Sequence, residues 1–204
     1  MAEITVVHLL RHGEVHNPNH VLYGRLPDYH LSANGRMMAA AAADYFDGRP
    51  VAAVFASPLE RAQETAQPLA ERLGLAIDTV AGWAEADRGA HRYRSTETLR
   101  AEGGEAWERF LADPIRYLGA EPATFRAGVL AALAATTAGQ DRTARVVAFT
   151  HGLPVNVALA HALGLDSVTT FLVGYGSVTR LRRRPDGNFG VSSVNETAHL
   201  RSGD

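Results

Sequence analysis

The sequence predicts an α/β fold in which a mainly parallel sheet carries helices on both faces, in three layers (α/β/α), with an antiparallel edge near the C-terminus. Short apolar, β-branched segments alternate along the chain with longer Ala- and Leu-rich segments of helical spacing. This alternation is typical of parallel strands joined by crossover helices. The first strand-like segments are apolar at nearly every position, as a sheet buried on both faces requires.

The expected elements follow in order along the chain. Six segments have the length and composition of strands: 4–10, 51–56, 75–80, 145–150, 177–183 and 188–194. Five segments with apolar residues at helical spacing are the predicted helices: 32–46, 58–73, 104–112, 122–138 and 154–163. The turn sequence RPDGN at 184–188 separates the last two strands and predicts an antiparallel hairpin at the edge of the sheet.

We expect a single domain over residues 1–204. The 204 residues, 46% of them hydrophobic, suffice for one sizeable core, and they contain no internal repeat or low-complexity linker. Residues 82–103 include few large apolar residues and many charged ones. We therefore expect 82–120 to form a small cap or loop region over the functional site.

The composition excludes several classes of function. A formal net charge of -2 gives no reason to expect nucleic acid or an anionic membrane as a partner. The absence of cysteine rules out disulfides, thiol catalysis and thiolate metal sites. The start, MAEITVV, lacks the features of a signal peptide, and no apolar stretch approaches the ~18 residues that cross a bilayer. We expect a cytoplasmic protein that is a monomer or a homodimer.

Three predicted strands lead directly into a histidine or an arginine. The first ends at Arg11 and His12, the second leads into SPLER at 57–61, and the fourth leads into His151. Sites in open α/β sheets form just beyond the carboxyl ends of the strands. We therefore expect these side chains to converge on one edge of the sheet.

The SPLER segment also predicts how its arginine is placed. Ser57 is the expected N-cap of the following helix, and Glu60 completes a capping box. Arg61 then falls in the first helical turn, near the positive end of the helix. Taken alone, it reads as a solvated helix residue. Together with the histidines and arginine of the other two strand ends, it predicts a site for an anion such as a phosphoryl group.

Five motifs carry a resemblance to a known family: LLRHGE, YGRLPDYHLSANGRMMA, ASPLERAQETA, FTHGLPVN and the closing NETAHL. In this order and spacing they resemble the histidine phosphatase superfamily, also called phosphoglycerate mutase-like. The resemblance covers nearly the whole chain. It implies that His12 is the nucleophile and forms a phosphohistidine, while Arg11, Arg61 and His151 hold the oxygens of the phosphoryl group. It implies no metal and no other cofactor.

The family's proton donor usually follows the third strand, in a Leu-x-Glu-x-x-x-Gly context. WAEADRG at 83–89 is similar to this pattern and places Glu85 in the donor's position. One carboxyl group can protonate the leaving alkoxide and later activate water. Asp87 is the competing candidate for this role.

The chain departs from the family pattern in three places. Val15 stands where Thr or Ser is common, and Pro18 stands where an asparagine often binds phosphate, so Asn17 takes that role if any residue does. The frequent Trp-Glu-Gly after the acid is replaced by HRYRS at 91–95. Arg92 and Arg94 in that segment either recognise a second anionic group of the substrate or are solvated loop residues. Further expected substrate contacts come from the YGR segment: Tyr23, Gly24 and Arg25.

Three functions are compatible with these residues. The first is a phosphomonoester hydrolase acting through a phosphohistidine on a small phosphorylated metabolite. The second is a mutase, but family mutases are usually longer and carry an inserted segment that encloses the substrate. The third is a non-catalytic module that binds a phosphorylated ligand, against which the whole set of expected catalytic residues argues. The expected partner is a small phosphate ester, and the sequence does not reveal which one.

His8 and the arginines at 182–184 are further basic residues, and we expect none of them to take part in catalysis. His8 falls inside the first strand, so we expect it to be packed. The arginines at 182–184 flank the hairpin turn and read as a solvated edge that discourages pairing with another sheet.

Overall fold

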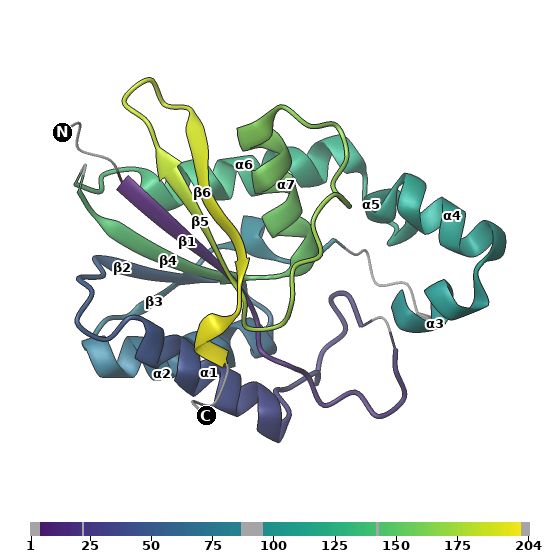
Figure 1. Cartoon of the computed structure of the whole chain (residues 1–204), viewed down its shortest axis with the longest axis horizontal. Coiled ribbons are helices and arrows are strands. Elements are labelled where there is room, and N and C mark those ends of the chain that lie inside the picture. Colours follow the sequence, from purple (N-terminus) through teal and green to yellow (C-terminus); the bar gives the residue numbers. More distant parts are fainter. Residues whose placement is uncertain (1–4, 22, 87–95, 142, 201–204) are drawn as a thin grey trace.

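The computed structural model describes residues 5–21, 23–86, 96–141 and 143–200 (Figure 1). Its centre is a six-stranded sheet in the order β3-β2-β4-β1-β5-β6. The strands are β1 (Thr5–Arg11), β2 (Ala53–Ala56), β3 (Ile77–Thr79), β4 (Arg145–Thr150), β5 (Val178–Arg183) and β6 (Phe189–Glu196). β3, β2, β4 and β1 pair in parallel, whereas β5 runs antiparallel to β1 and β6 antiparallel to β5. The predicted mainly parallel sheet with an antiparallel C-terminal edge is confirmed.

Helices cover both faces of this sheet, as Figure 1 shows. α1 (Ala33–Tyr45) and α2 (Glu60–Leu73) lie on one face, and α6 (Pro122–Thr137) and α7 (Gly152–Leu163) on the other. Alternate residues of each strand supply the two cores. Leu9 packs with the α6–α7 core and Leu10 with the α1–α2 core. Both faces are buried at β1, β2 and β4, which explains why these strands show no polar alternation.

The predicted helices agree with the structure to within about two residues at their ends, except in the cap region, where the helical pattern was incomplete. α4 (Gly104–Ala112) has the expected bounds, but α3 (Thr96–Glu102) lies within 82–103, where we predicted a loop or small cap and no helix. Leu99 in α3 is 1% exposed. Leu99 is the one large apolar residue in the sequence TETLRAE, and one such residue gives too little periodicity to predict a helix.

The segment after the third strand leads to the cap region. The short helix η1 (Ala81–Trp83) is fixed by Trp83, whose side chain is fully buried and whose Nε1–H donates to Thr136 Oγ1 of α6 at 3.1 Å. α3, α4 and α5 (Pro114–Tyr117) extend beyond the edge of the sheet on the α6 side (Figure 1). The chain closes with a further short helix, η2 (Ala198–Leu200). Within the part of the chain that the structure describes, no helix has the length and apolar character needed to cross a membrane.

The strand register sets the position of the functional side chains. Arg11 pairs with Thr150 across β1 and β4, and Ala56 pairs with Phe149 across β2 and β4. The residues that follow these pairs therefore leave the sheet at the same carboxyl edge. This is the edge at which the sequence predicts a site.

Candidate active site

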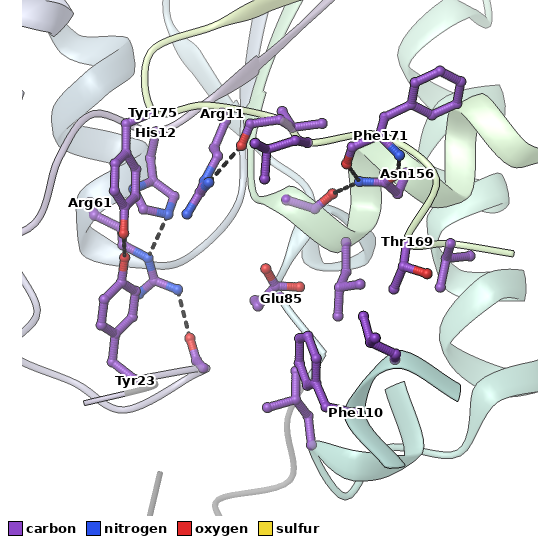
Figure 2. A pocket seen from close by; sticks show the side chains of 18 of the residues that line it. Arg11, His12, Tyr23, Arg61, Glu85, Phe110, Asn156, Thr169, Phe171 and Tyr175 are labelled. Carbon is purple, nitrogen blue, oxygen red and sulfur yellow. Dashed lines mark hydrogen bonds between the residues drawn. The ribbon is translucent and has the colours of Figure 1, made fainter. Parts of the chain in front are cut away.

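His12 lies directly beyond β1 and is held by the backbone on both sides. Its N–H donates to Thr150 O at 2.9 Å, and its carbonyl accepts from Gly176 N at 3.1 Å. The imidazole is 2% exposed. Its Nδ1 lies 2.8 Å from Gly13 O, and since a carbonyl can only accept, Nδ1 carries the hydrogen. Nε2 is then left with a lone pair, which accepts a hydrogen bond from Arg61 Nε at 3.2 Å (Figure 2).

The glycine after His12 is required by close packing of two backbones. A Cβ on Gly13 would lie 2.5 Å from Gly35 O at the start of α1. The Gly13 N–H donates to Thr65 Oγ1 of α2 at 3.0 Å. No side chain fits at Gly13 without moving α1, so this residue fixes the path of the chain immediately after His12.

Arg61 enters the site from the first turn of α2 and is fully buried. Besides the bond to His12, its Nη2 donates to Gly24 O at 2.6 Å, whereas Nη1 has no hydrogen-bond partner among the described residues. Its guanidinium lies over the Tyr23 ring, 4.7 Å from the centroid. The expected position of Arg61 in the first helical turn is confirmed.

The expected capping role of Ser57 is wrong. α2 begins at Glu60, its N-cap is Leu59, and no side chain caps it. Ser57 Oγ instead accepts from Leu59 N at 3.3 Å and lies 2.8 Å from His151 Nε2. The hydroxyl is engaged by a partner 94 residues away in sequence, and this contact replaces the local cap.

His151 is the N-cap residue of α7 and is fully buried, with its ring centroid 5.0 Å from that of His12. Its Nδ1 has no partner among the described residues. Arg11 completes the group: its Nη1 donates to Val173 O at 2.6 Å, and its guanidinium lies 3.9 Å from the centroid of the Tyr175 ring. Arg11 Nε is buried and unpartnered among the described residues.

Three buried nitrogens near His12 are thus left without partners: Arg11 Nε, Arg61 Nη1 and His151 Nδ1. Arginine nitrogens can only donate, and the histidine nitrogen donates when it carries the proton. A buried donor without an acceptor is unfavourable. Unpartnered donors of this kind near His12 are suited to the oxygens of an anion, because each oxygen could satisfy one of them.

The two histidines are neutral under ordinary conditions. Burial lowers the pKa of His12 well below its usual value, and the charges of Arg61 and Arg11 lower it further. Burial and the charge of Arg61 likewise lower the pKa of His151. An unprotonated imidazole retains the lone pair that a nucleophile needs.

Glu85 lies after η1, and its carboxyl group points into the same cavity (Figure 2). Burial raises its pKa, although the hydrogen bond from Ala86 N and the charges of Arg61 and Arg11 act in the opposite direction. A carboxyl group with a raised pKa is suited to donating a proton near neutral pH. Asp87, the competing candidate, lies outside the described residues.

The remaining expected contacts differ in their placement. Asn17 lines the cavity, but its Nδ2 donates to Val21 O at 2.7 Å and its Oδ1 accepts from Val21 N at 3.0 Å. Tyr23 and Gly24 also line the cavity, and Gly24 contributes the carbonyl that accepts from Arg61. The amide of Asn17 is thus already bonded to the backbone of the chain. The role of Asn17 in phosphate binding remains a prediction.

Of the three arginines expected to contact the substrate beyond its phosphoryl group, the structure describes only Arg25. Arg25 donates from Nε to the backbone oxygen of Glu85 at 2.6 Å and does not line the cavity. Arg92 and Arg94 lie outside the described residues.

The cavity has a volume of about 320 Å³ and extends well beyond His12. Its lining includes Tyr175, whose hydroxyl lies 3.0 Å from that of Tyr23, and apolar residues of α4 and of the chain before β5. None of these was predicted, because none lies in a motif or at a predicted strand end. In the described ranges, no group of three or more His, Asp or Glu side chains is arranged to hold a metal ion.

Comparison with known proteins gives the family. Residues 7–197 match the model of the histidine phosphatase superfamily (branch 1). Over 79 residues the chain is 61% identical to a Mycobacterium tuberculosis (strain H37Rv) protein named "Uncharacterized protein Rv0525". This match covers 39% of each chain, so it spans about two fifths of that relative's length.

Two solved structures share the fold. Phosphoserine phosphatase from Entamoeba histolytica, in complex with 3-phosphoglyceric acid, superposes with a TM-score of 0.78 at 23% identity, covering 97% of this chain and 100% of that one. Mycobacterial glucosyl-3-phosphoglycerate phosphatase Rv2419c superposes with a TM-score of 0.80 at 23% identity, covering 95% and 99%. The family model takes in nearly the whole chain and the fold agrees with it, so the chain belongs to the histidine phosphatase superfamily, branch 1.

Proposed function

We propose that this chain is a phosphomonoester hydrolase that acts through a phosphohistidine on His12. One observation carries the proposal: His12 Nε2 has a lone pair beside the buried guanidinium of Arg61, and Arg61 Nη1, Arg11 Nε and His151 Nδ1 have no hydrogen-bond partner among the described residues. Phosphoryl transfer depends mainly on positioning and on stabilising charge on the oxygens of the transferred group. These residues are suited to both tasks.

In the first step, His12 Nε2 attacks phosphorus in line with the leaving oxygen. Arg61 Nε gives up its hydrogen bond to Nε2 and donates to a phosphoryl oxygen instead. The Nε2–P bond forms while the bond from phosphorus to the ester oxygen breaks. Arg11, Arg61 and His151 hold the remaining oxygens, where negative charge accumulates. The Nδ1–H of His12 keeps its hydrogen bond to Gly13 O and so stabilises the positive charge that the ring acquires. The carboxyl group of Glu85 gives its proton to the departing alkoxide.

In the second step, water replaces the ester oxygen. The carboxylate of Glu85 takes a proton from water as the water oxygen bonds to phosphorus. The Nε2–P bond breaks, inorganic phosphate forms and His12 regains its lone pair. Glu85 ends the cycle protonated, as it began it.

We favour hydrolysis of the phosphate ester over a mutase reaction. The cap region, 82–120, is short, whereas family mutases usually carry a longer segment that encloses the substrate. The two solved relatives are phosphatases by name, acting on phosphoserine and on glucosyl-3-phosphoglycerate. At 23% sequence identity, these two structures support the shared fold. We infer the activity of this chain from its own site.

The test is a screen for phosphate release over a panel of phosphate monoesters, with mutase activity on phosphoglycerate assayed in parallel. We expect release from at least some esters, no intramolecular phosphoryl transfer, and no release by His12→Ala purified in the same way. Mutase activity exceeding hydrolysis would contradict the proposal. Binding of phosphate esters without any turnover would instead identify a non-catalytic module.

A further inference from the structure

The cavity beyond His12 has an apolar outer half. α4 contributes Trp107 and Phe110, whose rings stack with centroids 5.7 Å apart, and α7 contributes Leu153. Figure 2 shows Phe110 beside Glu85, on the side of the cavity away from His12. Leu118 and Val168, 3% and 4% exposed, complete this part of the wall.

The polar side chains in the wall are already bonded to protein groups. Asn156 Nδ2 donates to Gly152 O and Phe171 O, each at 3.1 Å, and its Oδ1 accepts from Phe171 N at 3.1 Å. Thr169 Oγ1 lies 3.0 Å from Ser167 Oγ. Asn17 is bonded to the Val21 backbone, and the hydroxyls of Tyr23 and Tyr175 are bonded to one another. A ligand hydroxyl or amine entering this half loses its water and gains few new partners, which is unfavourable.

The described part of the cavity wall contains few charged side chains. Among the described residues that line the cavity, these are Arg11, Arg61 and Glu85. The two arginines are assigned to the phosphoryl group, and Glu85 to the proton. The described wall therefore offers no cation for a second anionic group of the substrate.

The mouth of the cavity exposes apolar surface to water. Leu172 lines the cavity and is 88% exposed, and Leu111 of α4 is 44% exposed. Large apolar side chains gathered at the rim of a pocket are typical of surfaces that a ligand covers. An apolar group reaching outward from the phosphate would contact both.

We propose that the substrate is the phosphate monoester of an alcohol with an apolar body, alkyl or aromatic, that fills this outer half. The inference rests on the proposed function. Phosphoserine and phosphoglycerate fit this cavity poorly, because the carboxylate of either molecule, or the amine of phosphoserine, would lie against the apolar wall. The inference therefore distinguishes this chain from a phosphatase that acts on them. Burial of the carbon atoms of the alcohol then determines which substrate is preferred, and Phe110 is the main residue that these atoms contact.

The experiment compares kcat/KM for ethyl, butyl and hexyl phosphate. These primary alcohols have nearly the same leaving-group pKa, so the chemical step is matched. Burial of each added methylene should raise kcat/KM about two- to fourfold, and hexyl phosphate should exceed ethyl phosphate at least tenfold. Pentyl phosphate should exceed 4-hydroxybutyl phosphate, which has the same number of heavy atoms, by about tenfold or more. O-phosphoserine and 3-phosphoglycerate should be among the poorest substrates.

Two variants test whether the apolar wall causes the dependence of kcat/KM on chain length. Phe110→Ala should reduce the hexyl-to-ethyl ratio at least threefold, and α4 contains no fully buried side chain, so the folded core is preserved. Met37→Ala is the matched control, because Met37 is an exposed apolar residue of α1 that does not line the cavity. It should leave the ratio unchanged.

The outcomes separate this inference from the proposed function. Efficient hydrolysis with no dependence on chain length, or with phosphoserine or phosphoglycerate preferred, would overturn the apolar substrate and leave the phosphatase intact. A phosphoglycerate preference lost on Arg92→Gln and Arg94→Gln would assign substrate recognition to those arginines and overturn it too. Absence of hydrolysis for every ester would overturn the proposed function, and this inference with it.

Discussion

His8 and His12 lie four residues apart at β1, and both imidazoles are 2% exposed. Burial and nearby arginines lower the pKa of both: to about 4 for His8, with Arg180 and Arg145 contributing, and well below the usual value for His12. Their surroundings differ. His8 lies inside the strand, with its ring 5.0 Å from that of Phe46 in an edge-on contact, and it lines a separate hollow with arginines of the neighbouring strands. His12 lies beyond the strand's end and lines the cavity into which Glu85 points.

The comparison shows that burial, arginine neighbours and a lowered pKa do not by themselves mark a catalytic histidine. What sets His12 apart is its Nδ1–H, which is bonded to Gly13 O and so orients the Nε2 lone pair, and a cavity that also holds the carboxyl group of Glu85. His8 is buried, as its position inside a strand predicts, and we expect it to have a structural role. The following predictions test this division, beginning with the largest effect.

Replacing each histidine separates the two roles most strongly. His12→Ala should lower kcat for phosphate ester hydrolysis by at least about 10⁴-fold, because it removes the nitrogen that we propose bonds to phosphorus. His8→Leu should change kcat and KM less than about twofold. The measurement is steady-state kinetics, with circular dichroism and thermal unfolding to establish that both variants are folded. A large loss of activity in folded His8→Leu would contradict the division.

Glu85→Gln tests the proton donor through the leaving group. Alkyl phosphates should be hydrolysed about 10²–10⁴-fold more slowly, because a poor alkoxide leaving group needs its proton. With p-nitrophenyl phosphate the first step should suffer far less, since the phenolate leaves without one, and phosphoenzyme should accumulate because water still needs a base. Asp87→Asn is the control. If Asp87→Asn shows this selectivity and Glu85→Gln does not, the proton donor is Asp87.

Arg61→Gln tests the unpartnered donors. Removing a donor that stabilises developing charge typically costs about 10²–10³-fold, and we expect a loss of that size in kcat/KM, together with weaker inhibition by inorganic phosphate. Arg72→Gln, at the other end of the same helix and paired at the surface with Asp44, should change kcat/KM less than about twofold. Equal effects of the two substitutions would contradict the assignment of Arg61 to the phosphoryl group.

The smallest expected effect involves His8 and concerns the free energy of unfolding. The folded protein keeps His8 neutral down to a pKa of about 4, whereas in the unfolded chain it binds a proton near pH 6.5. Stability is therefore lost as the pH falls through this window, because the unfolded state binds more protons. Between pH 7 and pH 5 the loss from His8 amounts to about 2 kcal/mol.

Urea unfolding of wild type and His8→Leu at the two pH values measures this contribution. The variant should lose less stability than the wild type on going from pH 7 to pH 5, while His12 and His151 continue to contribute in both proteins. The same pH dependence in the two proteins would show that His8 is not buried as a neutral group.

Much of the fold and the inner site could be predicted from local sequence. An apolar strand that ends in Arg11 and His12 is visible within a dozen residues, and parallel pairing then places His151 beside them. The long-range contacts could not be predicted in this way. Ser57 has the spacing of a helix cap, but its hydroxyl is engaged by His151, and no local pattern reports that contact. The apolar wall joins α4 to the chain before β5, two segments without a shared motif.

The central claim is that His12 Nε2 becomes covalently bonded to phosphorus during turnover. The direct measurement is rapid mixing with a ³²P-labelled phosphate ester, quenching, and mapping of the label on the protein. Glu85→Gln should be included, because it should accumulate the intermediate. We predict a phosphoenzyme that is labile in acid and stable in base, with the label on the peptide containing His12. A label on a serine or a carboxylate, or substrate turnover with no labelled protein in either form, would contradict the account.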